Sequence, residues 1–112
     1  MISKDLVAAS AKPLVLSILS ERESYGYEII RRVKDLSGGQ MQWKEGMLYP
    51  VLHRLEEQGL VSSEWRTADS GRKRRYYYLK DEGWRALKIE KRQWSMVHST
   101  LTKLWGTEQC LT

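Results

Sequence analysis

Four consecutive cations, Arg72 to Arg75, stand directly before three consecutive tyrosines, Tyr76 to Tyr78. Guanidinium and ammonium groups bind phosphates and carboxylates, whereas tyrosine rings usually pack in ordered protein. The segment 61–80 has six basic and two acidic residues, so it carries +4 of the +5 net charge of the chain. This concentration of charge predicts a polyanionic partner; the alternative is a basic surface that is only solvated.

The sequence gives little support for a metal site or a catalytic site. His53 and Glu57 are four residues apart on a predicted helix, but two ligands do not make a metal site, and His98 lies on a different element. The sequence has no glycine-rich phosphate loop, serine elbow or paired carboxylates. Cys110 is the only cysteine, which excludes an internal disulfide and is typical of a spectator thiol in a reducing cytoplasm. We therefore expect no enzyme activity, no metal and no cofactor.

A β-hairpin is predicted to position the basic residues. Residues 60–67 and 72–79 are rich in valine, tryptophan, threonine and tyrosine, and "ADSG" between them is a turn sequence. Strand alternation gives the second strand one face with Lys73, Arg75, Tyr77 and Leu79 and another with Arg72, Arg74, Tyr76 and Tyr78. The hairpin should therefore have a charged tip and an aromatic root.

Apolar periodicity and glycine stops predict four helices, over about residues 3–20, 24–37, 44–58 and 81–105. Ser24 is the expected N-cap of the second helix. Pro13 predicts a kink in the first helix or a helix that restarts there. Pro50 is tolerated if the third helix begins near Gly46, because the first four amides of a helix lack internal partners.

The last predicted helix is longer than a chain of 112 residues needs for its own core, at about 40 Å. Leu87, Trp94 and Leu101 recur every seven residues, with Val97 and Leu104 between them. This short heptad-like seam predicts a homodimer. We divide the chain at this point into residues 1–80 and a dimerisation helix with a short tail, residues 81–112.

No apolar run approaches the roughly 18 residues of a membrane span, and the N-terminus is a poor secretory signal.

Three helices, a two-stranded hairpin and a long helix, in that order, form a mainly α winged helix-turn-helix with a dimerising tail. The blocks "SYGYEIIRRV", "EGMLYPVLHRLEEQGLVSS" and "SGRKRRYYYLKDEG" closely resemble the signature blocks of PadR-type transcriptional regulators. The resemblance covers about residues 6–105, with all three blocks in order and correctly spaced.

The resemblance implies that the third helix enters the DNA major groove, where each base pair presents its own donor and acceptor pattern. The hairpin, or wing, would then contact the backbone or a minor groove. The residues expected to contact DNA are Tyr25, Tyr27, Lys44, Met47, Tyr49, His53, Arg54, Arg72, Lys73 and Arg74. The alternative for the three tyrosines is packing at the domain boundary.

The segment "KRQWSMVHSTLTKLW" resembles the short-tailed branch of the family, in which a tryptophan at the place of Trp94 stacks on aromatic drugs between subunits. Two features depart from the multidrug-sensing members: Lys12 and Pro13 fall where the first helix lines that pocket, and His98 replaces an acidic residue. The expected effector and dimer-interface residues are Ala9, Lys12, Leu16, Trp94, Val97, His98 and Leu101. The other four tryptophans are expected to be structural.

These features predict a cytoplasmic, homodimeric regulator, most simply a repressor, that binds a partly palindromic DNA operator. A planar aromatic effector between the last helices would release it. The alternative is a winged-helix module that grips an acidic protein with its basic wing, because fold does not fix function.

Overall fold

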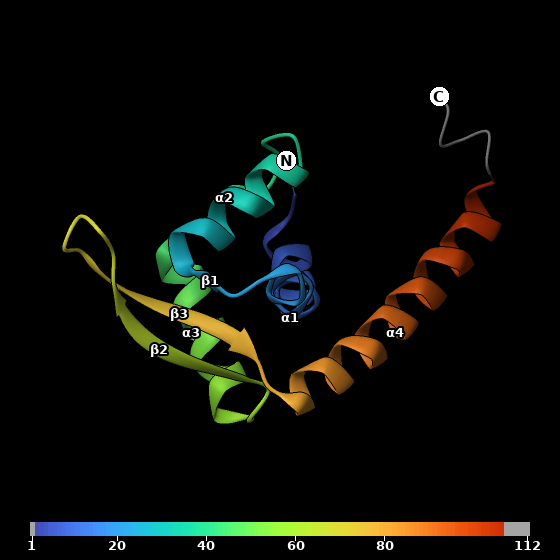
Figure 1. The fold of residues 1–112 in the computed structure, drawn as a ribbon. Helices are drawn as coiled ribbons and strands as arrows, with labels where there is room; N and C mark the ends of the chain where they lie inside the picture. The colour runs from blue at the N-terminus through green and yellow to red at the C-terminus, as the bar shows by residue number, and fades with distance from the viewer. Residues whose placement is uncertain (1, 107–112) are drawn as a thin grey trace.

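The computed structural model describes residues 2–106, so Cys110 lies outside the described residues. It is a mainly helical winged helix with a long C-terminal helix, as the sequence predicted (Figure 1). The molecule measures 52 × 29 × 22 Å, with α4 projecting from the rest. The elements are, in chain order, α1 (Lys4–Glu21), β1 (Ser24–Tyr25), α2 (Gly26–Leu36), α3 (Glu45–Glu57), β2 (Val61–Thr67), β3 (Lys73–Leu79) and α4 (Asp81–Trp105).

The core forms around α1, which contacts α2, α3, α4 and β3. Figure 1 shows α1 end-on in the middle of the fold, between α4 and the other elements. Val15 and Leu16 of α1 are fully buried, and so are Ile29 of α2 and Leu48 and Leu52 of α3. Burial of these apolar side chains supplies most of the free energy that stabilises the fold.

α1 is a single helix that runs through Pro13, so the predicted restart at this residue is wrong. Ser3 is the N-cap, and its hydroxyl accepts a hydrogen bond of 3.2 Å from the Leu6 amide. Pro13 has no N–H and leaves the Ala9 carbonyl without its usual helical donor. The apolar packing of α1 on four other elements outweighs that loss.

The start of α2 differs from the prediction. Ser24 is not its N-cap: Ser24 and Tyr25 form a short strand, β1, which pairs with Tyr77 and Tyr76 of β3. α2 begins at Gly26, and Glu28 accepts a hydrogen bond from the Tyr25 amide at 3.4 Å. A two-residue strand has no periodicity to detect, and serine before a helical pattern is typical of an N-cap.

α3 agrees with the predicted range to within one residue, but the predicted placement of Pro50 in the first turn is wrong. The helix begins at Glu45, which makes Pro50 its sixth residue and places it beyond the first turn. The helical hydrogen bond to the Gly46 carbonyl is therefore lost. Pro50 and Gly46 are both exposed, so solvent can satisfy that carbonyl.

The sheet has three antiparallel strands in the order β1-β3-β2, instead of the two predicted. β2 and β3 pair from Val61 with Leu79 to Thr67 with Lys73, as a hairpin at the predicted turn. Gly71 has a φ of 85°, which favours glycine there. β1 covers the edge of β3, so the wing is tied to the helical body along its inner half.

The bounds of α4 agree with the prediction. Its start is fixed to the body: the Lys80 amide donates to the Leu60 carbonyl at 3.0 Å, and a Cβ on Gly83 would lie 2.1 Å from that same oxygen. Only Gly83 and Leu87 of α4 are buried. Among the helices described, none is both long and apolar enough to span a membrane.

Candidate nucleic-acid interface

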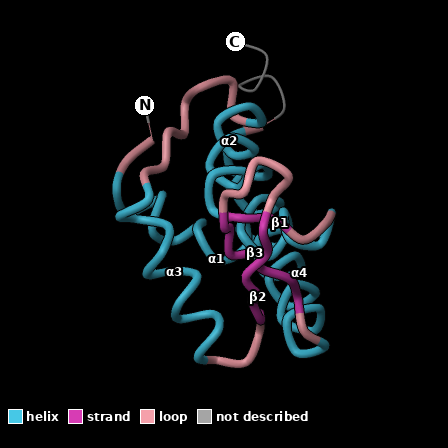
Figure 2. Tube along the Cα trace, turned by 60° about the vertical axis from the view of Figure 1, so that its left-hand side comes forward, coloured by secondary structure: helices cyan, strands magenta, loops and turns pink. Residues whose placement is uncertain are grey.

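A cleft of about 730 Å³ lies between the wing, the start of α2 and the start of α3. Six of the ten residues predicted to contact DNA line it: Tyr25, Tyr27, Tyr49, Arg72, Lys73 and Arg74. In Figure 2, α3 and α4 lie on opposite sides of the strands, so this cleft is separate from the α4 surface. The fold thus brings together residues that are up to 49 positions apart.

The three predicted wing cations are free of internal ion pairs. Within residues 2–106, no carboxylate lies within 4 Å of the charged groups of Arg72, Lys73 or Arg74. The Arg74 guanidinium instead lies 4.4 Å from the centre of the Tyr25 ring. Such a contact orients a cation without neutralising it. These charges remain available to an external anion.

The next arginine of the run behaves differently. Arg75 donates to the Ser63 hydroxyl at 2.8 Å and pairs with Glu56 of α3 at 3.1 Å. It ties the wing to the end of α3, whereas Arg72, Lys73 and Arg74 have no carboxylate partner among residues 2–106. The four consecutive cations therefore differ in their partners within the fold.

The tyrosine root of the wing is an ordered stack of rings and cations. Arg66 lies 4.6 Å from the Tyr76 ring centre, and Tyr76 meets Tyr25 edge-on at 5.4 Å. Glu23 holds Arg66 with two hydrogen bonds of 2.6 and 2.8 Å, and Glu64 pairs with the same guanidinium. The Arg66 hydrogen bonds lower the pKa of Glu23. The stack links the wing to the segment before α2.

Tyr77 is the residue that fixes the wing to the core. Its side chain is 4% exposed, on the opposite face of β3 from Tyr76, as strand alternation predicted. Burial raises the pKa of its hydroxyl above the ordinary tyrosine value. The charged tip and the aromatic root therefore have separate positions on one strand.

The predicted residues of α3 divide into two groups. Lys44, Tyr49, His53 and Arg54 are exposed, and His53 lies 3.4 Å from Glu57. Met47 is half-buried and packs against the core instead of facing outward. Met47 precedes buried Val51 by four residues, so it continues the inward stripe of the helix. The contact of Met47 with DNA stays a prediction.

Tyr49 both faces the cleft and holds two helices together. A Cβ on Gly26 would lie 2.6 Å from its hydroxyl oxygen, so the ring lies directly against the first residue of α2. The side chain remains 42% exposed. The two interpretations left open for this tyrosine, contact and packing, are compatible.

Five residues that line the cleft were not among the predicted DNA contacts: Arg31, Glu45, Trp65, Arg75 and Tyr77. Arg31 lies 5.8 Å from the Tyr27 ring, and the spacing of four residues on an exposed helix face was a usable signal. Trp65 was expected to be structural, yet it is 65% exposed and lines the cleft. Its position on a strand with a mixed burial pattern gave no signal.

The predicted effector and dimer residues lie on α1 and α4, away from the cleft. Trp94 lines a hollow of about 370 Å³ that Pro13 and Leu14 of α1 also line. Ala9, Lys12, Val97 and His98 are exposed, and Leu101 is half-buried. Leu16 corrects the prediction: it is fully buried in the core of its own chain, because α1 packs on several sides.

Comparisons with known proteins agree with this geometry. The model of the PadR-like family of transcriptional regulators matches residues 15–89. The transcriptional regulator YqjI of Escherichia coli is 31% identical over 88 residues, which are 79% of this chain but 41% of that protein.

Solved structures agree as well. A transcriptional regulator from Clostridium thermocellum is 29% identical, with a TM-score of 0.82 over 92% of this chain and 97% of the other. A PadR family regulator from Clostridium difficile is 31% identical, with a TM-score of 0.76 over 87% and 99% of the two chains. The family match covers most of the three-helix body and the wing, together with the start of α4. The chain belongs to the PadR-like family of transcriptional regulators.

Proposed function

We propose that this regulator is a cytoplasmic homodimeric repressor that binds a partly palindromic DNA operator. The observation that carries the proposal is the cleft in which three wing cations, unpaired among residues 2–106, lie opposite Tyr49 at the start of α3. Arg72, Lys73 and Arg74 contact phosphates, which provides affinity and register. Tyr49, His53 and Arg54 approach base edges in the major groove. Lys44, Tyr25 and Tyr27 add contacts to the backbone.

The dimer is proposed from the surface of α4. Several large apolar side chains on this helix are exposed, and on a lone chain they would face water: Trp84, Ile89, Met96, Val97, Leu104 and Trp105. Val97 and Leu104 are seven residues apart and lie on one side of the helix, away from the basic residues around Met96. A second copy that covers this side places two reading helices on one side of the assembly. Its symmetry sets two half-sites one or two helical turns apart.

The proposed release mechanism uses the hollow beside Trp94. A planar aromatic molecule stacks on this ring, between α1 and the α4 helices of the dimer, and changes the spacing of the reading helices. The half-buried position of Trp94 and the apolar walls of the hollow support this step. The molecule releases DNA only if it binds the two spacings with different affinity.

The test of DNA binding replaces Arg72, Lys73 and Arg74 with alanine. Affinity for a duplex that contains the region upstream of the gene should fall at least about tenfold, and the slope of log affinity against log salt should flatten by two to three counterions, roughly one for each lost phosphate contact. The matched control replaces Lys88, Lys91 and Arg92 of α4, which removes the same charge outside the cleft.

An equal loss of DNA affinity in both variants would show that binding depends only on the net charge of the protein. Undiminished binding by the wing variant would overturn the assignment. Weak binding of the wild type to any duplex, with little salt dependence, would favour the protein-interaction alternative.

A further inference from the structure

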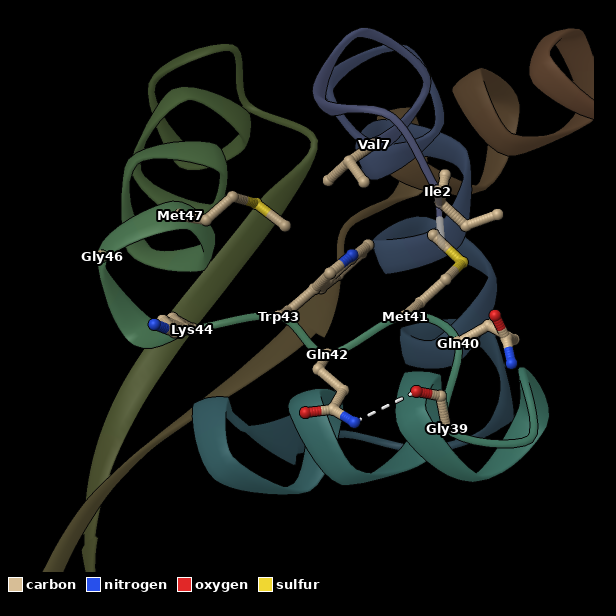
Figure 3. Close-up of a pocket in the computed structure, with 10 residues that line it drawn as sticks. All are labelled: Ile2, Val7, Gly39, Gln40, Met41, Gln42, Trp43, Lys44, Gly46 and Met47. Atoms are coloured by element: carbon tan, nitrogen blue, oxygen red, sulfur yellow. Dashed lines mark hydrogen bonds between the residues drawn. The ribbon is translucent and has the colours of Figure 1, made fainter.

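A second hollow lies beneath the start of the reading helix. It has a volume of about 610 Å³ and is bounded by the N-terminal end of the chain, the α2–α3 connection and the first turn of α3 (Figure 3). Most of its side-chain wall is apolar, from Ile2, Val7, Met41, Trp43 and Met47. The volume falls in the range of small-molecule sites, which are usually apolar with few polar groups.

Gln40, Gln42 and Lys44 also line the hollow, and its buried polar group is the indole N–H of Trp43. The side chain is 5% exposed, and its Nε1 atom has no hydrogen-bond acceptor among residues 2–106. Every other buried side-chain nitrogen or oxygen in that range has a partner. Figure 3 shows the ring inside the hollow, with its nitrogen toward the side chains of Val7 and Met41. A buried tryptophan N–H normally finds an acceptor.

We propose that this hollow binds a small uncharged molecule with an apolar body and one acceptor oxygen, which takes the hydrogen bond from Trp43. The ligand is uncharged because no charged group of residues 2–106 lies on the Trp43 side of the wall. Lys44 is the charged residue of the lining, and Figure 3 shows its ammonium group on the side away from Trp43. Two methionines in the wall adapt readily to the shape of a ligand.

The position of the hollow connects it to DNA reading. Trp43 and Lys44 directly precede α3, and Gly46 and Met47 belong to its first turn. A ligand in contact with these residues bears on the orientation of the reading helix. This consequence depends on the proposed function, whereas binding itself does not. If ligand weakens DNA binding, DNA must weaken ligand binding by the same factor.

The hollow is separate from the one beside Trp94. The two share Ile2 and Met41 as a common wall, but Trp94 lines one of them and Trp43 the other. The two sites therefore differ in their polar chemistry, since a donor from a buried indole is present in the Trp43 hollow. Variants of the two tryptophans distinguish them.

The test uses acetophenone and ethylbenzene, which have nearly the same shape and differ in one carbonyl oxygen. The indole N–H signals of the full-length protein are followed by NMR, and loss of one signal in Trp43→Phe identifies Trp43. Acetophenone should shift that signal downfield, and ethylbenzene should bind roughly tenfold more weakly. Trp43→Phe should bind both probes equally, and Trp94→Ala should keep the preference.

A second variant keeps the test independent of the folding of Trp43→Phe. Val7→Phe fills the hollow and should abolish binding of both probes while the Trp43 signal remains. Equal affinity of the wild type for the two probes would overturn the proposal. So would a shift confined to the Trp94 signal, or a Trp43 signal that moves on dilution without probe, which would identify a second copy as the occupant. Absence of DNA binding would leave these outcomes unchanged.

Discussion

The wing and α4 leave different groups without a partner within residues 2–106: charged groups on the wing and apolar side chains on α4. The wing is finished within one chain: Arg66, Tyr76, Tyr25 and Arg74 form a stack, and Tyr77 enters the core. What remains unpaired on the wing is charge. On α4, ion pairs and caps are local, and what remains uncovered is apolar surface, from Val97 to Trp105. The first surface suits a hydrated polyanion, and the second suits a copy of itself.

A substitution at the junction between the wing and α4 should lower the free energy of unfolding most. In Gly83→Ala, the added methyl group would clash with the Leu60 carbonyl, which is backbone and cannot rotate away. We expect a loss of about 3 kcal/mol in the free energy of unfolding, measured by urea denaturation. Gly46→Ala is the control, because a Cβ there meets nothing within 4 Å and the first turn of a helix accepts alanine, so stability should be unchanged or slightly higher. An equally stable Gly83→Ala protein would show that α4 can shift on the body.

Negative charge introduced on α4 should disrupt the dimer without changing the wing. Val97→Glu combined with Leu104→Glu places two carboxylates in the proposed dimer seam. We expect the dimer dissociation constant to rise at least about 100-fold, since two buried aliphatic side chains contribute about 3 kcal/mol together. Sedimentation velocity measures it. Ser95→Glu with Ser99→Glu adds the same charge on the basic side of the helix and should leave the dimer intact.

A second measurement sharpens the same comparison. If the wing is complete within one chain, the Val97 and Leu104 double variant should keep the ring-current-shifted NMR signals of Tyr25 and Tyr76. Loss of these signals together with the dimer would show that the wing depends on the partner. A double variant that stays dimeric would place the seam elsewhere on the chain.

Sequence periodicity predicted the elements that are long and amphipathic. The bounds of α4, and those of α3 to within one residue, follow from apolar spacing and glycine stops, because burial selects one face of a helix. The hairpin followed from its turn and alternation. These predictions depend on residues that are close together in the sequence.

The features that the sequence did not reveal depend on contacts between distant segments. β1 forms because Ser24 and Tyr25 meet the free edge of β3, about fifty residues later. Arg75 differs from Arg74 only because Glu56 and Ser63 lie beside it in the fold. Leu16 was assigned to an interface on its position in α1, and the core takes it because α1 packs on several sides. Tertiary packing decided each of these cases.

The smallest expected effect concerns the contact between Glu23 and Arg66, which tests how firmly the wing is fixed. The pKa of Glu23 is lowered in the folded chain, so its contribution to stability is present above the unfolded-state pKa and is lost as pH falls through the folded-state value. Glu23→Gln should lower the melting temperature slightly at pH 7, and the difference from wild type should disappear in acid. The effect is small because both side chains are exposed and Glu64 still pairs with Arg66.

Glu21→Gln is the matched control for this contact. Glu21 binds Arg32 with two hydrogen bonds of 2.8 and 3.0 Å, and these bonds likewise lower its pKa, but the pair joins α1 to α2 and does not touch the wing. Both variants should lose stability with the same pH dependence. Only Glu23→Gln should move the Arg66 side-chain NMR signal and the Tyr76 ring signals that depend on it. If neither signal moves, the ring stack holds the wing without Glu23, and the carboxylate serves stability alone.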